Sequence, residues 1–113
     1  MWAFMSMWAK DLLHNSPVWF VDGTFQASAS TLFYQLWIIS ARDPDTGMTF
    51  TALQALLPNK KGEAYSMIFE RLQKAGIAGP TVCHMDFEEA EIKSFKKHYP
   101  EAEVMGCDIH FKR

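Results

Sequence analysis

Cysteine, proline and glycine are scarce in this chain of 113 residues, and neither sign of charge dominates. The two cysteines, Cys83 and Cys107, cannot build a disulfide scaffold and are compatible with a reducing, intracellular compartment. A formal net charge of −2 gives no sign of the strongly basic surface of an autonomous DNA-binding domain. The apolar start of the chain is cut by Lys10 and Asp11, so it is too short for a membrane span, and it lacks the basic leading segment of a signal peptide. No membrane partner is expected.

Apolar side chains are plentiful. Hydrophobic residues make up 49% of the chain and aromatic residues 14%, which is typical of a globular protein and excludes a disordered one. A chain of this length suits one domain that buries roughly two-thirds of its unfolded surface. The composition therefore predicts a single domain with a substantial core.

The first 17 residues are predicted to form a short amphipathic helix and a lead-in. Trp2, Met5, Trp8 and Leu12 recur at helical spacing, and residues 14–17 (His-Asn-Ser-Pro) interrupt the pattern. We expect this helix to pack on the domain that follows.

Three apolar runs then predict an antiparallel meander. They span residues 18–25, 32–41 and 48–57, with short polar turns between them. The first run is continuous and does not alternate, so we expect this strand to be buried on both faces.

Helices and strands alternate in the second half. The pattern predicts a helix at residues 63–75, a strand at 81–86, a helix at 88–99, a strand at 103–106 and the start of another helix at 107–113. Three hairpin-linked strands followed by two right-handed crossovers give an α/β fold. Its five-stranded mixed sheet has the strand order 3-2-1-4-5, with strand 2 antiparallel, and is flanked by helices.

Asp22 and Asp86 interrupt the first and fourth strands of this sheet. In that strand order the two carboxylates become neighbours. A buried carboxylate normally needs a cation, a metal ion or several hydrogen-bond donors, and hard oxygen ligands suit Mg²⁺. Two carboxylates at adjacent strand ends therefore indicate a divalent metal site for phosphoryl-transfer chemistry.

Simpler interpretations of these acids remain open. Asp22 and Gly23 could form a turn, and Asp86 could cap the helix that starts near Glu88. Glu88 and Glu89 are better explained as favourable charges in the first turn of that helix.

Cysteine and histidine do not complete a zinc site in this chain. Cys107 and His110 lie one helical turn apart, but zinc requires four ligands and no second matched pair is present. Strand alternation would send the adjacent side chains of Cys83 and His84 to opposite faces. The lysines at 93, 96 and 97 are expected on a solvated helix face.

Several short motifs occur in a familiar order. They are Asp22-Gly23-Thr24-Phe25, Phe33-Tyr34-Gln35-Leu36, Ala55-Leu56-Leu57-Pro58-Asn59-Lys60, Glu63-Ala64-Tyr65, Asp86-Phe87-Glu88-x-Ala90 and Gly106-Cys107-Asp108-Ile109-His110-Phe111. Together they closely resemble the transposase domain of Mutator-like elements, the MULE domain. The resemblance runs from about Val18 to Arg113.

The resemblance implies a ribonuclease-H-like fold and an Asp-Asp-Glu triad that holds Mg²⁺ or Mn²⁺ for DNA strand cleavage and transfer. Asp22 matches the first acid and Asp86 the second. Cys107 and His110 match the Cys-x-x-His signature of the family. The implied partners are DNA, as transposon ends and target, and other transposase copies in an oligomer. The implied location is the nucleus.

The departure from the family concerns the third acid. No Glu in this chain matches it, so residues 18–113 are expected to be the N-terminal part of the domain, truncated after strand 5 and inactive as a fragment. The alternative is a transposon-derived protein that binds DNA or protein without catalysis. A ribonuclease-H-like nuclease acting on RNA is a third, less favoured reading.

Overall fold

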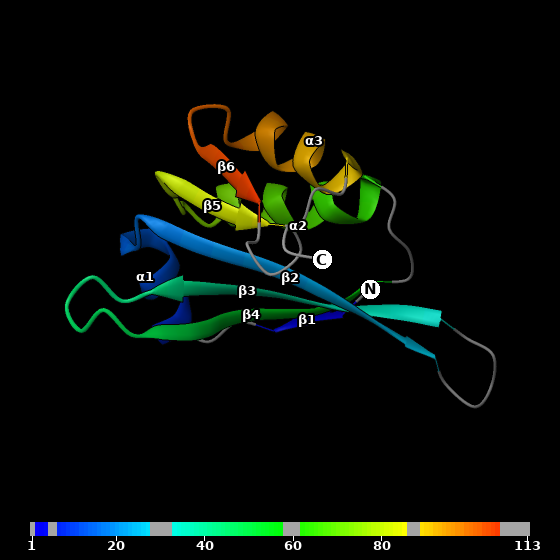
Figure 1. The fold of residues 1–113 in the computed structure, drawn as a ribbon, viewed down its shortest axis with the longest axis horizontal. Coiled ribbons are helices and arrows are strands. Elements are labelled where there is room, and N and C mark those ends of the chain that lie inside the picture. Colours follow the sequence, from blue (N-terminus) through cyan, green and yellow to red (C-terminus); the bar gives the residue numbers. More distant parts are fainter. Residues whose placement is uncertain (1, 5–6, 28–32, 58–61, 86–88, 107–113) are drawn as a thin grey trace.

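The computed structural model describes residues 2–4, 7–27, 33–57, 62–85 and 89–106 (Figure 1). The described elements, in chain order, are β1 (Trp2–Phe4), α1 (Met7–Asn15), β2 (Val18–Ala27), β3 (Phe33–Arg42), β4 (Thr49–Leu57), α2 (Gly62–Lys74), β5 (Val82–Met85), α3 (Glu89–His98) and β6 (Glu103–Gly106).

All of the described strands belong to one mixed sheet with the order β1-β4-β3-β2-β5-β6. β2 pairs with β5 and β5 with β6 in parallel, whereas the β2–β3, β3–β4 and β1–β4 pairs are antiparallel. The strands β4-β3-β2-β5-β6 reproduce the predicted order 3-2-1-4-5. The prediction of a mixed α/β sheet with the strand order 3-2-1-4-5 is therefore confirmed, with β1 added at one edge.

The prediction for the N-terminal segment is only partly right. Residues 2–4 form an edge strand in which Ala3 pairs with Ala55, and the helix begins later, at Met7. The unpaired backbone groups of β4 offer this segment hydrogen bonds that a helix could not form with the sheet. Trp8 and Leu12 follow in α1 as predicted, and Leu12 is buried.

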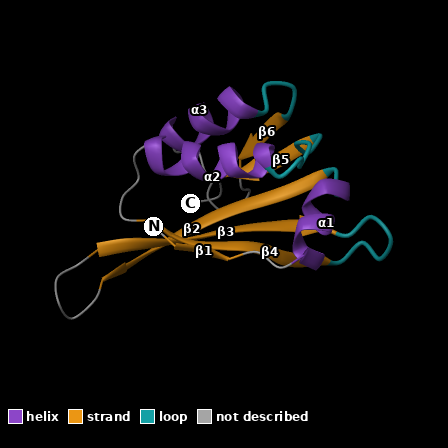
Figure 2. Ribbon diagram, turned by 180° about the vertical axis from the view of Figure 1, so that it is seen from behind, coloured by secondary structure: helices purple, strands orange, loops and turns teal. Residues whose placement is uncertain are grey.

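Helices α2 and α3 pack side by side on one face of the sheet (Figures 1 and 2). Trp37 of β3 is fully buried there, with its ring 5.4 Å from Phe69 and 5.7 Å from Tyr65, both on α2. Trp19 of β2 contacts Phe95 of α3 at a centroid distance of 6.4 Å. Large aromatic rings in edge and tilted contacts thus dominate the core between the two layers.

α1 contacts the same side of the sheet near the start of β2. The indole Nε1 of Trp19 donates a hydrogen bond to the carbonyl oxygen of Leu13 at 3.2 Å. The ring of Trp8 lies 5.3 Å from that of Phe50 on β4. None of the helices in the described ranges has the length and apolar character that a membrane crossing requires.

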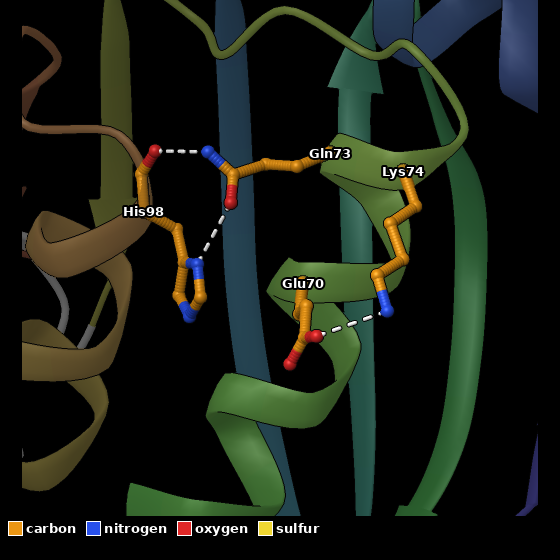
Figure 3. Close-up of polar contacts among 4 residues, drawn as sticks. All are labelled: Glu70, Gln73, Lys74 and His98. Atoms are coloured by element: carbon orange, nitrogen blue, oxygen red, sulfur yellow. Dashed lines mark hydrogen bonds and ion pairs between the residues drawn. The ribbon is translucent and has the colours of Figure 1, made fainter.

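The two large helices are joined by polar contacts at their C-terminal ends (Figure 3). Gln73 of α2 donates from Nε2 to the carbonyl oxygen of His98 at 2.6 Å, and its Oε1 lies 2.8 Å from His98 Nδ1. Because the amide nitrogen faces the carbonyl, the amide oxygen is the acceptor and His98 carries its proton on Nδ1. One turn earlier, the exposed Glu70 pairs with Lys74 at 3.1 Å along α2.

α2 ends where the sequence indicates. Gly76 adopts a φ of +81°, its N–H bonds the carbonyl of Gln73 at 3.0 Å, and the N–H of Ile77 bonds the carbonyl of Leu72 at 3.1 Å. A left-handed glycine with these two hydrogen bonds is a common helix C-terminus. The chain then turns back towards the sheet as β5.

Candidate functional site

Asp22 lies in the middle of β2, the strand between β3 and β5. Its Cα partner on β3 is Ile38, so the backbone continues as a strand through this position and the turn interpretation is excluded. A carboxylate on an internal strand is held by backbone pairing, which gives it a well-defined position.

The expectation that Asp22 is buried is wrong. Trp19 and Val21 point to the face that the helices cover and are buried, whereas Phe20 is half-buried and Asp22 is exposed on the other face. Side chains alternate along a strand, and the described helices contact only the Trp19 side. The Asp22 carboxylate makes no hydrogen bond or ion pair with any residue that the structure describes, so its oxygens are available to a ligand.

Asp86 follows Met85, the last residue of β5, and lies outside the described residues. Cys107 and His110 lie outside them as well. The described part of β5 pairs Val82 with Val18 and His84 with Phe20 of β2. The strand that leads to Asp86 is therefore adjacent to the strand that carries Asp22, as the sequence predicts.

Two stacked aromatic rings lie on the same face of the sheet as Asp22, two residues earlier along β2. The rings of Phe20 and His84 lie 4.9 Å apart and nearly parallel, at 10°. The guanidinium of Arg42 lies 5.5 Å from the centroid of the Phe20 ring. Such a cation–π contact at an exposed site contributes about 0.5–1 kcal/mol. His84 thus points away from the buried Cys83, as strand alternation predicts.

Burial raises the pKa of the Cys83 thiol, and the nearby Glu91 carboxylate raises it further. The thiol is therefore neutral at physiological pH and is a poor metal ligand and nucleophile. Within the described ranges, no group of three or more His, Cys, Asp or Glu side chains could hold a metal ion.

Glu91 is the acid that sequence reasoning missed. It lies in the first turn of α3, is only 3% exposed, and its Oε2 accepts a hydrogen bond from the indole Nε1 of Trp37 at 3.1 Å. Two signals could have found it. Its spacing of four from Phe95 places both on one helix face, and a buried tryptophan N–H needs an acceptor.

A cavity of about 750 Å³ lies at the opposite end of β5 from Asp86. Its lining includes Thr81 and Ala102, which precede β5 and β6, together with Ile77 and Tyr99. In parallel sheets, ligands bind beyond the carboxyl ends of the strands. This cavity is therefore separate from the candidate metal site.

Comparison with known proteins gives one family. Residues 18–113 match the family model described as "MULE transposase domain". Among curated proteins, none matches the chain. A solved structure titled "Drosophila P element transposase strand transfer complex" aligns with a TM-score of 0.46 and 12% sequence identity. The alignment covers 94% of this chain and 31% of the P element transposase chain, so this chain spans about a third of the length of that protein.

Proposed function

Because this chain belongs to the MULE transposase domain family, we propose that it is a segment of an Asp-Asp-Glu transposase catalytic domain. The proposed activity of the whole domain is metal-dependent DNA strand cleavage and transfer. The observation that carries the proposal is the exposed carboxylate of Asp22 on the central strand β2, beside the strand that leads to Asp86.

The residues present fit a hard divalent ion such as Mg²⁺ or Mn²⁺. Asp22 offers exposed carboxylate oxygens without a described partner, which suits these ions. Phe20 pairs with His84, and in the sequence Asp22 and Asp86 each follow two residues after this pair. We propose that these two carboxylates bind the ion. When bound, such an ion would activate an attacking oxygen and neutralise charge on the leaving oxygen.

The chain on its own is proposed to be catalytically inactive. No Glu in the sequence matches the third acid of the triad, and two carboxylates leave the metal site without a ligand that the reaction needs. Cys107 and His110 remain a predicted family signature. The proposed partners are transposon-end and target DNA and further transposase copies, and the proposed location is the nucleus.

Mn²⁺ titration followed by electron paramagnetic resonance tests the metal site. We expect Asp22→Asn to weaken Mn²⁺ binding by about tenfold or more, because it removes a charged oxygen ligand. Asp45→Asn is the matched control: Asp45 is an exposed aspartate in the β3–β4 turn, and its loss should leave Mn²⁺ binding unchanged. Equal binding by all three proteins would contradict the proposed metal site.

A DNA assay distinguishes the proposed transposase function from the alternative hypothesis of a binding protein without catalysis. With Mn²⁺ and element-end DNA, we expect no cleavage by this chain. Cleavage that disappears in Asp22→Asn would refute the proposed inactivity while supporting the role of Asp22. DNA or protein binding that is identical in the parent and Asp22→Asn would favour the alternative, a transposon-derived binding protein without catalysis.

A further inference from the structure

The face of the sheet that carries Asp22 also carries the exposed side chain of Arg42. Ala41 of β3 is buried on the face that α2 and α3 cover, so the next residue, Arg42, points to the opposite face. Its guanidinium carbon lies 5.5 Å from the centre of the Phe20 ring, which is on that face too. A cation and the proposed metal ligand Asp22 therefore share one side of the sheet.

The charge of Arg42 has no partner among the residues that the structure describes. Its neighbour Asp43 uses both carboxylate oxygens in the β3–β4 turn, one for the Asp45 N–H and one for the Thr46 hydroxyl, each at 3.1 Å. Arg42 forms no ion pair with any described residue. Glu103, which also points to this face, lies on β6, three strands away from β3, or about 14 Å. The guanidinium is thus free to bind an anion.

Two aromatic rings lie beside this cation. Phe20 and His84 stack with their centroids 4.9 Å apart and their planes at 10°, and both side chains are half-buried, so part of each remains exposed. Cross-strand pairing that stabilises the sheet explains the two rings, but it does not explain an unpaired guanidinium held against them. Exposed rings beside a cation are the combination with which proteins bind single-stranded nucleic acid, by stacking and by contact with phosphate.

These groups lie within the reach of one nucleotide from Asp22. Phe20 and Asp22 are two residues apart on β2, so their side chains share a face and their Cα atoms are separated by about 7 Å. A phosphate held by a metal ion at Asp22 would place the adjoining nucleotide of the same strand over Phe20 and Arg42. Of the proposed metal ligands, only Asp22 enters this relationship.

We propose that Arg42, Phe20 and His84 bind single-stranded DNA next to the phosphate held at Asp22. The Arg42 guanidinium pairs with a neighbouring phosphate, and the two rings stack against the base or sugar of that nucleotide. The cation–π contact holds the guanidinium in place before DNA arrives, which lowers the entropy cost of binding. This inference rests on the proposed function, because it takes DNA as the partner and Asp22 as a metal ligand.

Fluorescence anisotropy with a labelled oligothymidine strand, in the presence of Mn²⁺, measures this binding. We expect Arg42→Gln to weaken it about fivefold or more and to reduce the slope of log K against log salt by about 0.7, because one phosphate contact is lost. Phe20→Leu should weaken it about fivefold or more at an unchanged slope, because only stacking is lost. Arg71→Gln is the matched control. It removes the same charge from an exposed residue of α2, on the other side of the sheet, and should stay within about twofold of the parent.

Circular dichroism first establishes that each variant is folded. Parental DNA affinity in Arg42→Gln, an equal loss in Arg42→Gln and Arg71→Gln, or no binding by the parent would overturn the inference. Parental affinity in Phe20→Leu would overturn it as well, and His84→Leu takes its place in the same test if Phe20→Leu does not fold.

The Mn²⁺ titration of Asp22→Asn distinguishes this inference from the proposed function. If that variant binds Mn²⁺ like the parent, the proposed function fails and this inference with it. Mn²⁺ binding that depends on Asp22, together with parental DNA affinity in Arg42→Gln, refutes only the DNA contact.

Discussion

Gly79 lies directly against the ring of Tyr99, and a Cβ added to Gly79 would come within 2.7 Å of Tyr99 Cγ. Tyr99 cannot turn away easily, because its hydroxyl donates to the carbonyl oxygen of Ile77 at 3.0 Å. We expect Gly79→Ala to lower the free energy of unfolding by about 1–3 kcal/mol through overpacking. Urea denaturation measures the change. The control is Ala78→Ser at the neighbouring exposed residue, which should change the free energy of unfolding by no more than about 0.5 kcal/mol.

The same tyrosine makes stability depend on alkaline pH. Burial raises the pKa of Tyr99 from 10.0 to about 12, because the phenolate would lose hydration in the folded protein. The unfolded chain therefore releases this proton at lower pH than the folded chain. The contribution of Tyr99 to the free energy of unfolding is full below pH 10 and is lost as the pH rises towards 12. Unfolding midpoints measured across that range should fall less steeply in Tyr99→Phe than in the parent, and equal slopes would contradict the assignment.

Cys83 should resist alkylation in the folded protein. Its side chain is fully buried. Burial raises the pKa of its thiol, and the nearby Glu91 carboxylate raises this pKa further. At pH 8, we expect iodoacetamide to modify Cys83 about a thousandfold or more slowly than in the urea-unfolded chain, because reaction requires opening of the core. Peptide mapping by mass spectrometry gives the rate at Cys83 separately from that at Cys107. Similar rates with and without urea would show that β5 opens readily.

Gln73→Leu should loosen the junction of α2 and α3. It removes both hydrogen bonds to His98 and is expected to lower the free energy of unfolding by about 1–2 kcal/mol. Glu70→Gln is the control on the same helix, since it removes only the exposed ion pair with Lys74 and should have a smaller effect. Thermal denaturation followed by circular dichroism compares the two, and a larger loss in Glu70→Gln would reverse the ranking (Figure 3).

The sheet could be predicted from the sequence because its rules are local. Only five residues separate β2 from β3 and six separate β3 from β4, and helical crossovers of ordinary length place β5 beside β2 and β6 beside β5. Gly76 also fell at the predicted helix end, because a left-handed terminus has a strong residue preference.

The exposure of Asp22 could not be predicted in the same way. Val18 and Phe20 are as apolar as the buried Trp19 and Val21, so the sequence of β2 does not say which face the helices cover. That is decided by packing of α2 and α3 on the Trp19 side. β1 was missed for a related reason: its pairing with β4 joins segments about 50 residues apart, and no local pattern encodes it.

The position of β2 has a consequence for synthesis on the ribosome. β3 can pair with β2 soon after the first hairpin emerges, but the partner on the other side, β5, begins about 55 residues after β2 ends. At about 5–20 residues per second, that edge of β2 stays unpaired for about 3–11 seconds. An unpaired strand rich in aromatic residues invites pairing with other chains, so a slow stretch of translation before Val82 would raise the risk of aggregation.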